Sequence, residues 1–221
     1  MVSARSVAAL DPPRDCRLCP RLVAFRQANA TREPDWHNAP VPSFGGLDAR
    51  LLVVGLAPGR RGANATGRPF TGDWAGALLY PTLLDHGFAR GTYGARAADG
   101  LQLNDARITN AVRCVPPENK PTGPETNACR DFLAAEIAAM KRLACVVTLG
   151  NVAHASALRA FDVRAKDAPF GHGREYETPS GVRILASYHC SRLNTNTGRL
   201  TPAMFGTIFA RARDITRGAQ P

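Results

Sequence analysis

Four short apolar segments, separated by stretches with helical periodicity, limit the folds open to this chain of 221 residues. Three of the four are continuous apolar runs, which are typical of strands covered on both faces. Strands that alternate with helices indicate an α/β fold. We therefore predict a three-layer α/β/α architecture with a central four-stranded, mainly parallel sheet, whose strands cover residues 50–56, 106–112, 144–150 and 182–188.

Helical patterns fill the intervals between the predicted strands and follow the last one. They cover residues 73–87, 124–142, 151–161 and 201–217. Asn151 opens the third pattern, and asparagine is a residue type that favours the N-cap of a helix. We therefore expect Asn151 to cap that helix.

The chain is expected to form a single domain over residues 1–221. Its length suits one hydrophobic core, and no internal repeat or long linker divides it. Residues 11–44 are rich in proline and weakly periodic, so we expect them to wrap around the core. No apolar run approaches the roughly 18 residues that span a membrane. We expect a cytoplasmic monomer without membrane association.

Basic residues outnumber acidic ones, which gives a formal net charge of +10 and a pI of about 10.0. A charge of this sign raises the affinity for polyanions such as nucleic acid. Arginine supplies nearly all of it, and its planar fork can bind two phosphate oxygens at once. A solvated, arginine-rich surface without such a partner is the alternative.

Polar loops follow three of the predicted strands, and in a parallel sheet these strand ends lie at one edge, where ligands bind. The loops read GLAPGRRGANATGRPFTGD, TNAVRCVPPENKP and SYHCSRLNTNTGRL. The first lacks the Gly-Lys-Ser/Thr of a phosphate loop and the Gly-x-Gly-x-x-Gly of a dinucleotide turn. Phe70, in this loop, can stack on a planar base or belong to the core. Both interpretations stay open.

The cysteines are expected to bind a metal rather than to form disulfides, because the chain shows no secretory signal. Cys16 and Cys19 form a Cys-x-x-Cys pair, and Cys114 and Cys129 follow without a second tight pair. A zinc ribbon normally has two such pairs, whereas an iron–sulfur cluster does not require them. The spacing alone leaves zinc and iron–sulfur open. Cys145 lies in a predicted strand and is expected in the core.

Together, the three loops and the cysteines between them resemble the iron–sulfur branch of the uracil-DNA glycosylase superfamily, and within it family 5. The resemblance runs from Cys16 to about Arg217. It implies a monofunctional DNA glycosylase of base excision repair, which flips uracil and other deaminated bases out of DNA and hydrolyses the N-glycosidic bond to leave an abasic site. It also implies a structural [4Fe–4S] cluster on Cys16, Cys19, Cys114 and Cys129, with zinc as the alternative.

The resemblance assigns a role to each loop of the base pocket. Gly55 and Ala57 would let the backbone close around the base, and Phe70 would stack on it. Asn110 would hydrogen-bond its Watson–Crick edge. His189 would donate a hydrogen bond where negative charge collects as the base leaves. The alternatives are a structural histidine and a turn-forming asparagine.

Asp73 is the only carboxylate in the first loop. Other families of the superfamily carry an acidic or amide residue at the position of Leu56, where it activates the attacking water. Because Leu56 cannot do this, Asp73 is our candidate for positioning water or stabilising the sugar cation. The alternative, which does not exclude the first, is that Asp73 caps the helix that begins there.

The third loop is expected to face DNA. Leu193 is the candidate wedge for the gap that the flipped base leaves, and Arg192 and Arg199 are candidate phosphate contacts. Cys190 stands where the family usually has proline, which puts a thiol near the site and removes a backbone restraint.

Two other functions compete with the glycosylase. A non-catalytic DNA-damage-binding protein would use the same pocket, and Cys190 is the feature that favours it. A nucleotide-handling enzyme with a zinc site is the other, although the sequence lacks a phosphate loop and a zinc-deaminase motif.

Overall fold

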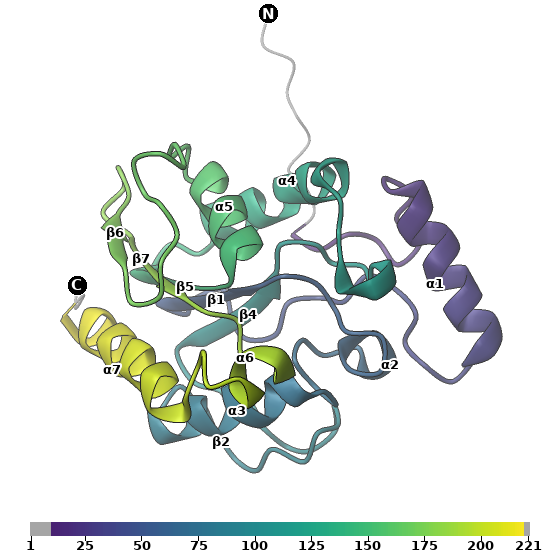
Figure 1. Cartoon of the computed structure of the whole chain (residues 1–221), viewed down its shortest axis with the longest axis horizontal. Coiled ribbons are helices and arrows are strands. Elements are labelled where there is room, and N and C mark those ends of the chain that lie inside the picture. The colour runs from purple at the N-terminus through teal and green to yellow at the C-terminus, as the bar shows by residue number, and fades with distance from the viewer. Residues whose placement is uncertain (1–9, 219–221) are drawn as a thin grey trace, which may run out of the picture.

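A computed structural model describes residues 10–218, and its centre is a five-stranded sheet (Figure 1). The order across the sheet is β4-β1-β5-β7-β6. The first four strands are parallel to one another, and β6 pairs with β7 in the antiparallel sense. The strands are β1 (Leu51–Gly55), β4 (Ala106–Asn110), β5 (Cys145–Leu149), β6 (Glu175–Glu177) and β7 (Arg183–Ser187).

The predicted mainly parallel sheet is confirmed, and its four predicted strands are β1, β4, β5 and β7. Every residue of β1, β4 and β5 is buried, as expected for strands that are covered on both faces. The sheet has one strand more than predicted. This strand, β6, is only three residues long, reads Glu-Tyr-Glu and is partly exposed, so no apolar run marked it.

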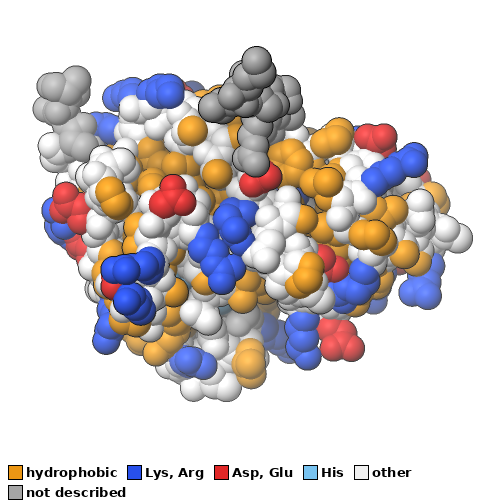
Figure 2. All heavy atoms as spheres, turned by 90° about the horizontal axis from the view of Figure 1, so that it is seen from above, with side chains coloured by type: hydrophobic (Ala, Val, Ile, Leu, Met, Phe, Trp, Pro, Cys, Tyr) orange, Lys and Arg blue, Asp and Glu red, His pale blue; other side chains and the backbone are white. Residues whose placement is uncertain are grey.

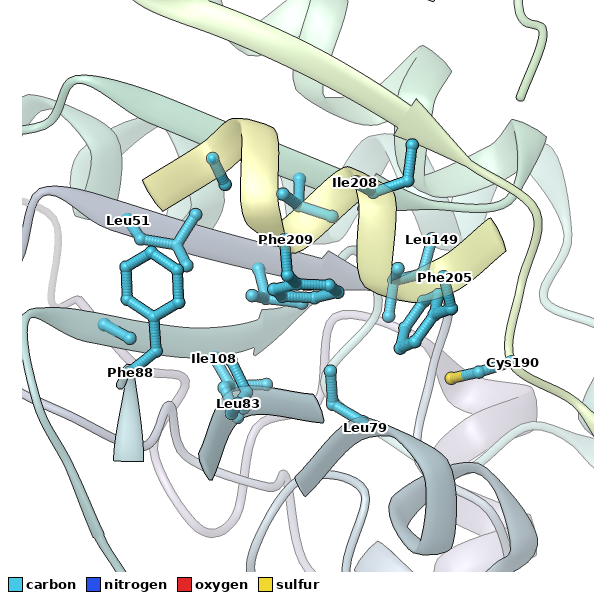
Figure 3. Packing of buried hydrophobic residues seen from close by; sticks show 14 of the residues in the cluster. Leu51, Leu79, Leu83, Phe88, Ile108, Leu149, Cys190, Phe205, Ile208 and Phe209 are labelled. Atoms are coloured by element: carbon cyan, nitrogen blue, oxygen red, sulfur yellow. The ribbon is translucent and has the colours of Figure 1, made fainter. Parts of the chain in front are cut away.

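Two helices cover each face of the sheet, which confirms the three-layer prediction (Figure 1). On one face, α3 (Trp74–Asp85) and α7 (Pro202–Gly218) supply Leu79, Leu83, Phe205 and Phe209 to the larger core cluster. Figure 3 shows these side chains packed together with Leu51, Ile108 and Leu149 of the sheet. On the other face, α4 (Gly123–Ala139) and α5 (Asn151–Ala160) pack over the smaller cluster.

The N-cap of α5 corrects the sequence-based expectation. Gly150, not Asn151, occupies the cap position, and no side chain caps this helix end. Gly150 has φ +93°, a conformation that a residue with a side chain rarely adopts. The chain therefore turns from β5 into α5 one residue earlier than predicted.

Several short elements carry no strong pattern in the sequence and were not predicted. Within the proline-rich segment, α1 (Pro20–Arg32) lies at the periphery of the molecule (Figure 1). It begins with proline, which suits the first turn of a helix, and buries only three residues, so its apolar stripe is thin. The other elements are α2 (Ala63–Thr66), β2 (Ala89–Arg90), β3 (Gln102–Leu103), the 3-10 helix η1 (Pro117–Asn119) and α6 (Arg192–Asn196).

Within the described residues 10–218, no helix is both long and apolar enough to cross a membrane.

A buried group of charges joins the N-terminal segment to the sheet and α4. Glu136 of α4 accepts from Arg107 Nε at 2.5 Å and from Arg113 Nη2 at 2.6 Å. Arg113 also donates to Asp11 Oδ1 at 2.7 Å and to Ser43 Oγ at 2.6 Å. Glu136 is thus the shared partner of two buried guanidinium groups.

Replacing this shared partner should destabilise the protein strongly. Glu136→Gln leaves Arg107 without a counter-charge and Arg113 with Asp11 alone, so we expect the free energy of unfolding to fall by about 3–5 kcal/mol. Glu118→Gln is the matched control, because Glu118 forms an exposed pair with Lys120 that contributes little. Urea denaturation of both variants measures the difference. Equal stability of the two would contradict the assignment.

Candidate active site

A cavity of about 640 Å³ opens at the carboxyl ends of β1, β4 and β7. Three stretches of chain line most of it: the loop after β1, the end of β4, and the turn after β7 that leads into α6. These are the three loops that the sequence predicted to converge. Of the predicted site residues, the lining includes Ala57, Phe70, Asp73, Asn110, His189, Arg192 and Leu193.

Phe70 lies at the meeting point of these loops. Its side chain is 5% exposed and belongs to the larger core cluster, and it also lines the cavity. Its ring centroid lies 6.1 Å from that of His189, with 29° between the ring planes. Phe70 is therefore a core residue that also forms part of the cavity wall, and its stacking on a base stays a prediction.

Gly55 does not line the cavity but makes this packing possible. It is the last residue of β1 and pairs with Asn110, the last residue of β4. A Cβ atom at position 55 would overlap with Cζ of Phe70 and with Oδ1 of Asn110. Only glycine lets the phenyl ring and the amide lie against the end of the strand.

A group of residues that sequence reasoning missed holds Phe70 in place. The backbone of Phe70 has φ +52°, a strained conformation for a bulky residue. The Tyr80 hydroxyl donates to the preceding carbonyl at 2.6 Å, and the Tyr93 hydroxyl donates to the Phe70 carbonyl at 3.3 Å. Arg68, paired with Asp99 at 2.7 Å, lies within 6.0 Å of both tyrosine rings. These contacts join distant positions, and no local pattern marks them.

Asn110 carries a buried polar atom without a partner. The residue is 3% exposed, and its Oδ1 makes no hydrogen bond in the structure. An unsatisfied buried acceptor costs about 1–3 kcal/mol. The position of Asn110 is fixed, because Ala111 N donates to Gly55 O at 2.9 Å directly beside it. Asn110 also lines the cavity, so its amide can serve a ligand that brings complementary hydrogen-bonding groups.

Asp73 both caps α3 and lines the cavity. Its Oδ1 accepts from Gly76 N at 3.1 Å, as an N-cap side chain does. Its Oδ2 faces the loop, where a Cβ at Gly62 would approach to 2.5 Å and one at Gly59 to 3.1 Å. Burial raises the pKa of this carboxyl above its ordinary value. The cap interpretation is correct, and it leaves one carboxylate oxygen for another role.

His189 is a neutral side chain at neutral pH. Burial lowers its pKa to about 4, because a charged imidazolium would lose its hydration. Its backbone is held on both sides: Asn194 Nδ2 donates to the His189 carbonyl at 2.8 Å, and Tyr188 N donates to Nδ1 of His172 at 3.2 Å. The imidazole can therefore act as an uncharged hydrogen-bond donor on a loop whose backbone is held in place.

Cys190 lies behind the wall of the cavity, where burial and, to a lesser degree, the nearby Asp73 carboxylate raise the pKa of its thiol. The residue is fully buried in the larger core cluster and does not line the cavity. Figure 3 shows its sulfur beside Leu79 and Phe205. The thiol thus fills the core beneath the third loop.

The three candidate DNA contacts occupy different environments. Leu193 is 72% exposed on α6 and lines the cavity. Arg192 also lines it, with its guanidinium carbon 5.5 Å from the centre of the Trp74 ring. Arg199 lies outside the lining, with its guanidinium carbon 4.5 Å from the centre of the Tyr188 ring.

Positive charge surrounds the cavity. Arg60, Arg61 and Arg192 line it, whereas Asp73 is the only carboxylate in the lining. On the face shown in Figure 2, lysine and arginine side chains lie in several separate groups, with acidic side chains between them. The charge of its lining therefore suits the cavity to an anionic ligand.

The four cysteines singled out by the sequence share a second, small apolar cavity. Cys16, Cys19, Cys114 and Cys129 all line it, and all four are free thiols. Arg113 N donates to Cys129 Sγ at 3.3 Å. Among residues 10–218, no three potential metal ligands are grouped as closely as around a bound ion. A set of four sulfur donors around one cavity nevertheless fits a metal or cluster.

The fold and the cavity define a member of the uracil DNA glycosylase superfamily. The model of the family described as "Uracil DNA glycosylase superfamily" matches residues 42–213, and the chain belongs to this superfamily. Within it, the chain is 46% identical over 206 residues to the type-5 uracil-DNA glycosylase of Thermus thermophilus. The aligned region covers 90% of this chain and 93% of that protein. The predicted resemblance to family 5 is confirmed.

Two further relatives agree with this assignment. The type-5 uracil-DNA glycosylase of Mycobacterium leprae is 44% identical over 209 residues, or 90% of this chain and 91% of that protein. The type-4 uracil-DNA glycosylase of Archaeoglobus fulgidus is 32% identical over 171 residues, or 74% of this chain and 78% of that protein. The chain is thus more similar to these type-5 proteins than to that type-4 protein.

Gly55→Ala should damage the site more than the fold. The added methyl group must displace the Phe70 ring and the Asn110 amide, and misplacement by about 1 Å lowers turnover about 100-fold. Gly123→Ala is the matched control, because no atom lies within 4 Å of a Cβ at that position. The measurement is single-turnover release of uracil from DNA, with the melting temperature as a check of folding. Unchanged turnover in Gly55→Ala would refute the proposed packing role.

Proposed function

We infer that the protein is a uracil-DNA glycosylase of base excision repair. The observation that carries this inference is the buried, unpartnered Oδ1 of Asn110 at the end of a cavity walled by Phe70. Uracil presents an N3–H donor between two carbonyl oxygens, so an amide can accept from N3–H and donate to a carbonyl. The names of the relatives support the same activity.

The base must leave the duplex to reach this pocket. Both Asn110 and Phe70 are buried, and a base inside the helical stack cannot approach them. The enzyme therefore binds the nucleotide flipped out of DNA. Phe70 supports one face of the base, and Asn110 reads its Watson–Crick edge. The arginines at the cavity hold the flanking phosphates.

Hydrolysis breaks the bond between C1′ of deoxyribose and N1 of uracil. Water adds to C1′, and the base leaves as an anion that then takes up a proton. His189 donates a hydrogen bond to the base carbonyl on which this charge collects, and such preorganised donors lower the barrier. Asp73 uses its second oxygen to hold the water or to stabilise the positive charge on the sugar. Leu56 also lines the cavity but has no group that can activate water.

We extend the proposal to other deaminated bases. Asn110 offers both a donor and an acceptor, so it can pair with more than one pattern of carbonyl and N–H groups. A non-catalytic DNA-damage-binding protein has no observation in its favour, since the Cys190 thiol lies in the core. We also propose that the protein acts as a monomer in the cytoplasm.

Asp73→Asn should separate the two roles of Asp73. The amide oxygen of asparagine caps helices about as well as aspartate does, so we expect the melting temperature to be retained. The loss of charge should lower the rate of uracil excision about 100-fold or more. Asp85→Asn, at the far, exposed end of the same helix, is the control.

The assay uses a duplex with one uracil, followed by alkaline cleavage at abasic sites. If Asp73→Asn excises uracil at the wild-type rate, Asp73 is a helix cap only. If the wild-type protein leaves the duplex intact, the proposed function itself is wrong.

We further propose that Cys16, Cys19, Cys114 and Cys129 hold a structural [4Fe–4S] cluster, with zinc as the alternative. Two of these cysteines directly precede α1, and the other two follow β4 in the chain, so a cluster would tie the N-terminal segment to the sheet. Glycosidic hydrolysis transfers no electron, and the cluster has no part in the reaction at Asn110.

Removal of one sulfur ligand should abolish the cluster. We expect anaerobically purified wild-type protein to be brown, and Cys16→Ala and Cys129→Ala to be colourless and to unfold at a lower temperature. Cys145→Ala, a core cysteine outside this cavity, should stay brown. Visible absorption and iron and zinc analysis decide the question. A colourless wild-type protein containing zinc would establish the alternative.

A further inference from the structure

Trp74 is a large apolar side chain that is exposed but held in place. It is the first residue of α3, lines the active-site cavity and is 50% exposed. Its Nε1 donates to Thr195 Oγ1 at 2.8 Å, and the Arg192 guanidinium carbon lies 5.5 Å from its ring centre. Both partners belong to α6, which lies beside α3 (Figure 1). The indole is thus fixed in orientation while half of its surface remains in water.

The surroundings of Trp74 combine a flat apolar surface with positive charge. Arg60 and Arg61 line the same cavity, and the Arg192 guanidinium lies over one face of the ring, which leaves the other face for a base. Leu193, the next residue on α6, is 72% exposed. Aromatic faces interleaved with cations are what single-stranded nucleic acid binds, since every base has a π-face and every nucleotide a phosphate.

We propose that Trp74 is a stacking platform for an unpaired nucleobase next to the flipped nucleotide, and that Thr195 and Arg192 orient the indole for it. This inference rests on the proposed function, because DNA is the ligand. In an intact duplex the faces of the flanking bases are covered by their neighbours, whereas in a single strand they are free. Trp74 therefore contributes more to binding of single-stranded than of double-stranded DNA.

Leu193 gives the proposal an internal contrast. A wedge fills the gap that a flipped base leaves in a duplex, and a single strand has no such gap to be held open. Loss of Leu193 should weaken duplex binding most. Loss of Trp74 should weaken single-strand binding most. The two exposed apolar residues of the cavity, Trp74 and Leu193, should thus differ in which form of DNA they help to bind.

Binding titrations test this directly. We expect Trp74→Ala to weaken binding of a uracil-containing single strand about 10-fold or more, the range for loss of one stacked base, and to weaken binding of the matching duplex much less. Leu193→Ala should show the reverse order. Thr195→Val keeps the indole but removes its hydrogen bond, so it should show a smaller loss on the single strand. An equal loss on both substrates for Trp74→Ala would overturn the proposal.

Fluorescence provides a second, independent readout. The chain has two tryptophans, Trp36 and Trp74. The Arg60 guanidinium carbon lies 5.2 Å from the centre of the Trp36 ring, so Trp36 could also respond to a ligand in the cavity. A Trp36→Phe variant leaves Trp74 as the sole reporter. A single strand carrying bases should quench its fluorescence, whereas an abasic strand of equal length should bind without quenching. Equal quenching by both strands, or none, would overturn stacking. Because neither readout needs excision, a failure here is distinct from a failure of wild-type protein to release uracil.

Discussion

Gly55 and Asn110 end two neighbouring parallel strands at the same level, and the active-site cavity is built on this pairing. The missing side chain at position 55 leaves room for a phenyl ring on one side and an amide on the other. Phe70 reaches that place only with a left-handed backbone, which Tyr80, Tyr93 and the Arg68–Asp99 pair maintain. The pairing of Gly55 with Asn110 thus places both the Phe70 wall of the cavity and the unpaired Oδ1 of Asn110.

The parts of the fold that sequence could predict are those in which one local pattern decides the structure. Apolar segments marked β1, β4, β5 and β7, and three of the four are continuous runs, as is typical of strands covered on both faces. The edge strand β6 escaped because Glu175–Glu177 is short and polar, and α1 because its apolar stripe is thin. In the site, the predicted carboxyl ends of the strands were enough to predict that Asn110 and the three loops lie at one edge of the sheet. The Arg68–Asp99 pair was not predicted because it joins two distant residues that no sequence pattern connects. That the chain forms a single domain stays a prediction.

Buried ion pairs connect the N-terminal segment and α4 to the residues that follow β4. Arg113 holds Glu136 and Asp11 through its side chain, while its backbone N–H points to the sulfur of Cys129. The next residue is Cys114, another of the four cysteines. The ion pairs and the sulfur-lined cavity therefore share one stretch of backbone, directly after the strand that carries Asn110. A displacement of the cysteines would therefore be transmitted to β4 through this stretch of backbone.

The low pKa of His189 has a consequence for which bases such a site can release. A neutral imidazole supports a departing anion without neutralising it, so the acidity of the leaving group matters more than it would beside a cation. Deamination replaces an exocyclic amino group by a carbonyl, over which the anionic base spreads its charge. Normal cytosine and adenine lack that carbonyl and are poorer leaving groups. In the proposed mechanism, an uncharged His189 would let the acidity of the leaving base, together with the shape of the pocket, select which bases are released.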